Sequence, residues 1–252
     1  FNKKIKLLKI TSSLETQSSL ETQSSPETQS SPETQSSPEK VIISLSGGVD
    51  SMVLIFYLLK NHYKPEEIII IHINYNNRTE SREEESFLRE YCKEKGLTFE
   101  CLTMNLKRGS INRTDYEKIT NQLRYKFYRD IMNKYSGKNI LLAHHKDDII
   151  ENIFSNFCRG RSLLNLGVIK ELGIVNGTII HRPMLELTKE EIYNYAHYYS
   201  VPYFLNTTPD WSVRGKLRKS ILDNVISVFP SFKYSIYNSV KELDGWNEII
   251  NK

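Results

Sequence analysis

Residues 41–51 read Val41-Ile42-Ile43-Ser44-Leu45-Ser46-Gly47-Gly48-Val49-Asp50-Ser51, an apolar run that leads through two glycines into a helical pattern beginning Met52-Val53-Leu54. The run predicts a buried strand. A loop at a helix N-terminus presents unpaired N–H groups and the positive end of the helix dipole, and both attract anions. We therefore expect this loop to bind nucleotide phosphates, through Ser46, Gly47, Gly48, Val49, Asp50 and Ser51.

Asp50 stands among these donors and would repel a phosphate unless a cation lay between them. A Mg²⁺ ion that bridges the carboxylate and a phosphate oxygen resolves the repulsion. No Gly-Lys-Ser or Gly-Lys-Thr follows the glycines, so the loop does not indicate γ-phosphate transfer. A plain glycine turn with a serine cap stays open as an alternative.

Outward from this loop, short β-branched runs alternate with helical patterns from residue 41 onward. The alternation predicts an α/β fold: a five-stranded parallel sheet with helices on both faces, followed by a small C-terminal helical appendix. Strands are expected at 41–45, 68–73, 98–103, 139–143 and 178–181, and helices at 49–61, 81–95, 114–135, 147–157, 188–199, 214–228 and 231–246. Thr188 and Glu191 have the spacing of a helix capping box.

A second polar motif follows the fourth expected strand and reads His144-His145-Lys146-Asp147-Asp148-Ile149-Ile150-Glu151-Asn152. Open α/β sheets gather their sites at the carboxyl ends of strands, so this motif should lie near the phosphate loop. A zinc site is one alternative, although adjacent histidines do not easily face one ion and no cysteine supports them. A helix start capped by an aspartate is another.

Composition and the N-terminal segment indicate which partners and which cellular compartment the sequence permits. The net charge is +4, which permits a polyanionic partner without requiring one. Three cysteines without a C-x-x-C pair favour free thiols and a reducing compartment, and no apolar run is long enough to span a membrane. Residues 12–39 repeat a six-residue unit rich in Ser, Thr, Gln, Glu and Pro, and we expect residues 1–40 as a whole to be a disordered low-complexity segment. We expect a cytoplasmic protein, or an organellar one if residues 1–40 follow a targeting segment.

Six motifs in order resemble those of the tRNA(Ile)-lysidine synthase N-terminal domain, which belongs to the PP-loop ATP pyrophosphatases. They are the 46–51 loop, His72-Ile73-Asn74-Tyr75-Asn76-Asn77-Arg78, Arg124-Tyr125-Lys126-Phe127, the 144–151 motif, Arg159-Gly160 and Arg182-Pro183-Met184-Leu185. The resemblance covers residues 41 to about 222. It implies a sheet of the adenine-nucleotide α-hydrolase type over residues 41–205, with residues 206–252 as a helical extension and candidate tRNA contact.

The resemblance also implies an activity and roles for particular residues. ATP would activate C2 of the wobble cytidine in an isoleucine tRNA, and free lysine would then displace AMP. Asp50 and Asp148 would hold Mg²⁺, while His72 and the loop would bind ATP. His145 or Asp147 would accept the lysine proton, and Arg124 would line the site. Arg159 and Arg161 would meet the lysine carboxylate or RNA phosphate; a solvated helix end is the alternative for both.

The chain departs from the family pattern at 206–219, where Asn206 and Gly215 replace the usual Asp and Asn. Arg214, Lys216 and Arg218 keep a basic spacing suited to RNA phosphates, although lysines in solvent remain an alternative. Three other functions stay open: tRNA 2-thiolation by a related PP-loop enzyme, small-molecule amide formation, and nucleotide or RNA binding without turnover. The oligomeric state is open as well, with a homodimer as one arrangement.

Overall fold

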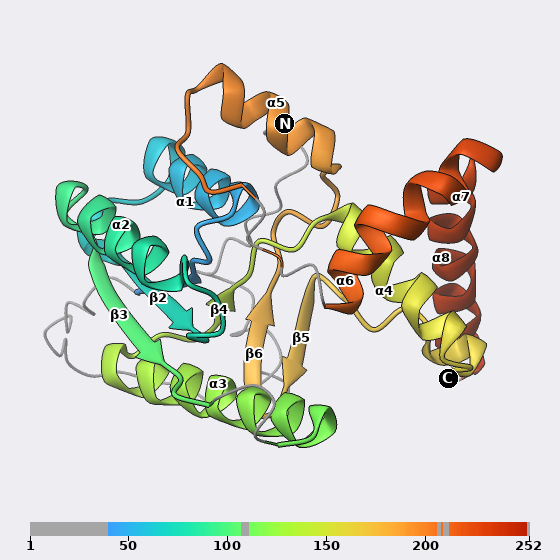
Figure 1. The fold of residues 1–252 in the computed structure, drawn as a ribbon, viewed down its shortest axis with the longest axis horizontal. Coiled ribbons are helices and arrows are strands. Elements are labelled where there is room, and N and C mark those ends of the chain that lie inside the picture. The colour runs from blue at the N-terminus through green and yellow to red at the C-terminus, as the bar shows by residue number, and fades with distance from the viewer. Residues whose placement is uncertain (1–39, 107–110, 206–207, 209–211, 251–252) are drawn as a thin grey trace, which may run out of the picture.

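A computed structural model describes residues 40–106, 111–205, 208 and 212–250. The low-complexity segment expected over residues 1–40 lies outside these described residues, apart from Lys40. The same holds for Asn206 of the departing 206–219 stretch, while Arg214, Gly215, Lys216 and Arg218 are described. Figure 1 shows a sheet flanked by helices, with a helical group at one side.

The sheet has six strands in the order β3-β2-β1-β4-β6-β5. Five of them are parallel, and β5 runs antiparallel to β6. The α/β class with a mainly parallel sheet is confirmed, whereas the expected number of five strands is wrong. The strands are β1 (Val41–Ser44), β2 (Ile68–Asn74), β3 (Thr98–Thr103), β4 (Ile140–Leu141), β5 (Leu172–Val175) and β6 (Thr178–His181).

The additional strand, β5, forms a hairpin with β6 through Asn176 and Gly177. Both turn residues have positive φ, 49° and 74°, which a two-residue type I′ turn requires. Leu172 and Ile174 are 50% and 76% exposed, so β5 is an edge strand without the continuous burial of its neighbours. It lacks the buried apolar run from which the other strands were predicted. The Asn-Gly pair, which is typical of a hairpin turn, was the feature of the sequence that indicated this strand.

Helices cover both faces of the sheet, because successive strand residues point to opposite sides. Val41 and Ile43 pack with α1 (Val49–Asn61), α2 (Ser81–Glu94) and α5 (Lys189–Tyr198). Ile42 packs on the other face with α3 (Arg113–Tyr135). Strands that are buried on both faces read as unbroken apolar runs, and this explains why β1 and β2 were easy to predict.

The C-terminal helices form a separate group with α4 (Lys146–Cys158), as expected for a helical appendix (Figure 1). The group comprises α6 (Val213–Lys216), a π-helical segment (Leu217–Leu222), α7 (Asp223–Val228) and α8 (Phe232–Ile250). Ile153, Leu166 and Val240 make its small core. The rings of Phe154 and Phe232 meet edge to face, with centroids 5.5 Å apart. Thus α4 belongs to this group rather than to either face of the sheet.

The strand order positions the site. Since β1 lies between β2 and β4, the chain leaves β1 toward β2 and β3 and later returns to its other side. The carboxyl ends of β1 and β4 are therefore neighbours at a topological switch point, where open α/β sheets bind ligands. The phosphate loop follows β1, and the His144–Glu151 motif follows β4. Among the described residues, no helix is both long and apolar enough to cross a membrane.

Candidate active site

Gly47 shapes the loop between β1 and α1. Its φ of +83° lies in the left-handed region, and an added Cβ would stand 3.1 Å from Phe204 Cδ2. Phe204 N–H donates a hydrogen bond to the Gly47 carbonyl oxygen at 2.9 Å, which ties the loop to the segment after α5. Only glycine combines this backbone conformation with so close a neighbour.

Two serines close the loop internally. Ser51 Oγ donates to the Gly48 carbonyl at 3.0 Å and accepts from Ser46 N–H at 3.2 Å, while the two hydroxyls lie 3.1 Å apart. Gly48 caps α1 without a side-chain hydrogen bond. The first-turn amides of α1 therefore remain available to an anion.

The second motif contributes buried carboxylates. Asp148 caps the start of α4 by accepting from His145 N–H at 3.1 Å. Asp148 is 5% exposed and Glu151 is 4% exposed. Charges buried to this extent require partners, and the surrounding elements supply them.

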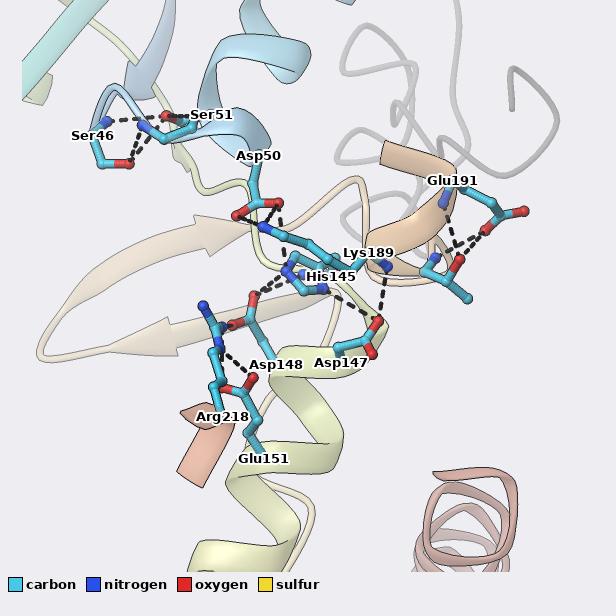
Figure 2. Close-up of polar contacts among 12 residues, drawn as sticks. Ser46, Asp50, Ser51, His145, Asp147, Asp148, Glu151, Lys189, Glu191 and Arg218 are labelled. Atoms are coloured by element: carbon cyan, nitrogen blue, oxygen red, sulfur yellow. Dashed lines mark hydrogen bonds and ion pairs between the residues drawn. The ribbon is translucent and has the colours of Figure 1, made fainter. Parts of the chain in front are cut away.

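Basic side chains from distant elements neutralise the acidic residues (Figure 2). Lys189 Nζ lies 2.6 Å from Asp50 Oδ1. Arg218, from the C-terminal group, lies 2.5 Å from Glu151 Oε1 and 3.1 Å from Asp148 Oδ1. Two further cations complete the set: Lys233 is 2.5 Å from Asp147, and Arg214 is 3.6 Å from Asp148. Four carboxylates thus face four basic side chains.

His145 lies at the centre of this network, with 1% of its side chain exposed. Its Nε2 is 3.5 Å from Asp50 Oδ1 and 3.5 Å from Asp148 Oδ2, and its Nδ1 is 3.8 Å from Asp147 Oδ2. Within the described part of the chain, neither ring nitrogen has a hydrogen-bond partner. The structure therefore brings Asp50, Asp148 and His145 together, although they come from two separate motifs.

Asp147 is engaged elsewhere. One oxygen accepts from Lys189 N–H at 2.8 Å at the start of α5, and the other pairs with Lys233. Burial raises the pKa of Asp147, but Lys233 and the Lys189 amide outweigh this effect and lower the pKa below its ordinary value. Of the two residues expected to accept a proton, Asp147 therefore has both carboxylate oxygens engaged by other groups.

The charges around Asp148 keep it ionised. Burial raises its pKa, but His145 and Arg214 outweigh burial and bring the pKa down to about 2. His144 behaves in the opposite way: burial lowers its pKa to about 4. Arg182 Nε donates to His144 Nδ1 at 3.1 Å, so the neutral ring carries its proton on Nε2.

A cavity of about 1020 Å³ opens on the β2 side of the loop and is lined by His72, Tyr75 and Arg124. Arg124 donates to the Tyr75 hydroxyl and lies over the Tyr75 ring, 5.5 Å from its centroid. His72 is buried, and burial lowers its pKa. Because a carbonyl oxygen can only accept, the ring donates through Nδ1 to the Leu45 carbonyl at 2.8 Å. His72 therefore both lines the cavity and supports the strand end before the loop.

The remaining basic residues do not form one surface. Arg159 lines the cavity of about 1020 Å³, and Arg161 is exposed just beyond the end of α4. Lys216 is exposed, whereas Arg214 and Arg218 point toward Asp148. The expected row of phosphate contacts at 214–218 is thus divided between solvent and the acidic cluster.

Sequence reasoning missed three residues of the site: Lys189, Lys233 and Phe204. Each lies far along the chain from its partner, so no local motif links them. For Lys189 one signal existed, because a lysine directly after the helix cap Thr188 opposes the helix dipole and calls for a compensating anion. Glu151 was part of the quoted motif but received no role.

The donor set fits a magnesium ion that arrives with a nucleotide. Within the described residues, no group of three His, Cys, Asp or Glu side chains is arranged to hold a metal. Asp50 and Asp148 both approach the same nitrogen of His145, and they offer the hard oxygen ligands that Mg²⁺ prefers. Mg²⁺ is usually held by few carboxylates together with water and substrate phosphates, which is the arrangement available here.

The fold and the phosphate loop define a class, the PP-loop nucleotide-binding proteins. Comparison of the sequence with known protein families gives the same class. The chain belongs to the PP-loop domain family (ATP_bind_3), which matches residues 17–225. A U34-tRNA thiolase from Methanococcus maripaludis shares the fold, with a TM-score of 0.63 at 21% identity over 81% of this chain and 71% of that one.

Among curated proteins, the chain is similar to several with the same printed name. The chain is 29% identical to a tRNA(Ile)-lysidine synthase from Staphylococcus epidermidis over 83% of this chain and 48% of the relative. It is 33% identical to one from Staphylococcus aureus, over 72% of this chain and 43% of the relative. The chain thus spans about half the length of these relatives. The family resemblance read from the motifs is confirmed, and the relatives do not favour the thiolation alternative.

Proposed function

We propose that this chain carries the catalytic part of an ATP-dependent tRNA(Ile)-lysidine synthase. The enzyme would form a carbon–nitrogen bond between free lysine and C2 of the wobble cytidine, releasing AMP and pyrophosphate. One observation carries the proposal: the phosphate loop after β1 and the Asp148 motif after β4 converge on His145 at the switch point of the sheet. The named activity of the curated relatives supports it.

In the first step, the cytidine C2 oxygen would attack the α-phosphorus of ATP, and pyrophosphate would leave. Ser46, Ser51 and the first-turn amides of α1 would hold the phosphates and meet the charge that develops on their oxygens. Asp50 and Asp148 would hold Mg²⁺, which supplies electrostatic stabilisation of that charge when bound. Arg124, in the cavity on the other side of the loop, would contact the nucleotide or the base.

In the second step, the lysine amine would attack C2, and AMP would leave with the activated oxygen. His145 would accept the amine proton, because its ring nitrogens have no hydrogen-bond partner among the described residues while Asp147 is committed to Lys233. A positioned general base contributes roughly 100-fold or more to such a step.

The test uses ATP labelled at the α-phosphate with isoleucine tRNA, in the presence and absence of lysine. We expect tRNA-dependent adenylation by the wild type, none by Asp148→Asn, and adenylation without efficient lysine transfer by His145→Gln. Asp130→Asn is the matched control, since Asp130 pairs with Lys126 on the exposed side of α3. Absence of tRNA-dependent AMP formation by the wild type would refute the proposal.

A further inference from the structure

Lys189 connects the two halves of the site, although neither motif contains it. It is the first residue of α5, and its N–H donates to Asp147 Oδ2 at 2.8 Å. Its ammonium reaches across to Asp50 and contacts both carboxylate oxygens, at 2.6 and 2.8 Å (Figure 2). The backbone of Lys189 is thus bonded to the His144–Glu151 motif, while its ammonium pairs with Asp50 of the phosphate loop.

The contact between Lys189 and Asp50 is one that can be broken. The two side chains are 26% and 25% exposed, and an ion pair that is open to water contributes little net stability. A cation in the first turn of a helix is also opposed by the helix dipole. In contrast, the carboxylates of Asp148 and Glu151 are only 7% and 5% exposed, although their partner Arg218 is 33% exposed.

The charge balance of the site shows why such a pair would be useful. Asp50 is the second residue of α1 and lies within the phosphate loop, where an unpaired carboxylate would repel an incoming phosphate. With Lys189 on Asp50, this repulsion is cancelled before any ligand arrives. Asp50, His145 and Lys189 also line one cavity of about 520 Å³, so the ammonium has open space beside it.

We propose that Lys189 exchanges partners during nucleotide binding. In the nucleotide-free protein its ammonium neutralises Asp50, and it moves to a nucleotide phosphate when Asp50 turns to Mg²⁺. A lysine suits this role because its charge is a compact point on a flexible stem with rotatable donors, whereas an arginine fork is fixed in plane. The inference rests on the proposed function only in requiring ATP at the loop.

Two binding measurements with opposite expected signs test the exchange. In Lys189→Met, Mg²⁺ alone should bind the nucleotide-free protein several-fold more tightly by calorimetry, because no ammonium competes for Asp50. The same variant should bind an ATP analogue with a non-cleavable α,β bond about tenfold more weakly in saturating Mg²⁺, since a hydrogen bond to a charged group is lost. Either change without the other overturns the exchange.

Three controls keep the result interpretable. Lys126→Met removes a lysine from an exposed ion pair on α3 and should change neither affinity. In an Asp50→Asn background, adding Lys189→Met should no longer affect Mg²⁺ binding, because the competition has already been removed. Thermal unfolding of each variant confirms that it is folded. If the wild type binds no ATP analogue, the proposed function fails; if it binds and Lys189→Met binds equally well, only the exchange fails.

Discussion

At the scale of single residues, Gly47 is required both by its left-handed backbone conformation and by its close contact with Phe204. Gly160 provides a matched control, because its φ of +70° is similar but an added Cβ would have no atom within 4 Å. We expect Gly160→Ala to cost about 1–2 kcal/mol from left-handed strain alone. Gly47→Ala should cost clearly more, because its Cβ would press on the Phe204 ring.

Urea unfolding of both glycine variants measures this difference, and binding of the ATP analogue shows whether the loop has moved. Equal free energies of unfolding for the two variants would mean that the Phe204 contact yields without strain.

His144 gives a pH dependence with a definite sign. Burial lowers its pKa from 6.5 to about 4, so the unfolded chain binds a proton more readily than the folded protein between these values. Stability should therefore fall as the pH drops from about 6.5 to about 4, and it should be unaffected by this group above that window. Asp148, with a pKa of about 2, stays ionised throughout.

His144→Gln should flatten this part of the stability profile, measured as the free energy of urea unfolding between pH 4 and 7. His62→Gln, which removes an exposed histidine after the end of α1, is the control for the loss of a histidine elsewhere in the chain. An unchanged slope in His144→Gln would assign the pH dependence to another group.

Residue-level prediction from sequence worked where chemistry is local. The glycines, Ser46, Ser51 and the Asp147-Asp148 pair stand in short motifs, and their placement follows from a strand end and a helix start. Lys189 could not be assigned in this way, because it meets Asp50 across 139 residues of chain. Such an ion pair forms only when the chain is folded. Its one sign in the sequence is a lysine in the first turn of a helix, where the helix dipole disfavours a positive charge.

At the scale of elements, Arg218 joins the π-helical segment after α6 to α4. Removing its guanidinium would leave Glu151, whose side chain is 5% exposed, without its arginine partner, and Asp148, 7% exposed, with Arg214 as its remaining arginine. Arg218→Ala should therefore destabilise the protein by about 3 kcal/mol, the lower end for a broken buried pair because Arg218 itself is 33% exposed.

Arg113→Ala removes a partner from an exposed pair on α3 and should change the free energy of unfolding by less than about 0.5 kcal/mol. Adding Glu151→Gln to Arg218→Ala should restore part of the loss, since the uncompensated charge is then removed. Equal effects of the two arginine variants would show that the buried carboxylates find other partners.

Element prediction succeeded for the buried parallel strands and the capped helices, including the Thr188–Glu191 capping box. It failed for β5, because an edge strand with exposed Ile174 carries no continuous apolar run. It also gave β4 five residues instead of two, since apolar neighbours of a strand need not pair. Turn chemistry at Asn176 and Gly177 was a better guide to β5 than hydrophobicity.

At the scale of the whole molecule, the C-terminal group has a small hydrophobic core of its own, separate from the two larger clusters on the faces of the sheet. That core contains Ile153, Leu166 and Val240, and the Lys233–Asp147 pair joins α8 to the first turn of α4 within the group. Amides of α8 should thus open with a lower free energy than those of β1, as measured by native-state hydrogen exchange.

Lys233→Met should accelerate exchange in α8 further while leaving β1 unchanged. Lys134→Met, which removes a lysine paired with Glu100 near the other end of the molecule, is the control. Matching exchange in α8 and β1 would indicate that the two parts open only together.

The ion pairs of the site also have a consequence for the order in which the chain folds. Asp50–Lys189, Asp147–Lys233 and Glu151–Arg218 span 139, 86 and 67 residues. Closing such long loops costs conformational entropy, and the ion pairs can stabilise the protein only after the sheet has brought their side chains together. Substitutions at the Asp147–Lys233 and Glu151–Arg218 pairs should therefore speed unfolding and leave the folding rate nearly unchanged in stopped-flow experiments. We therefore expect the sheet to form first and the ion pairs of the candidate site to close after it.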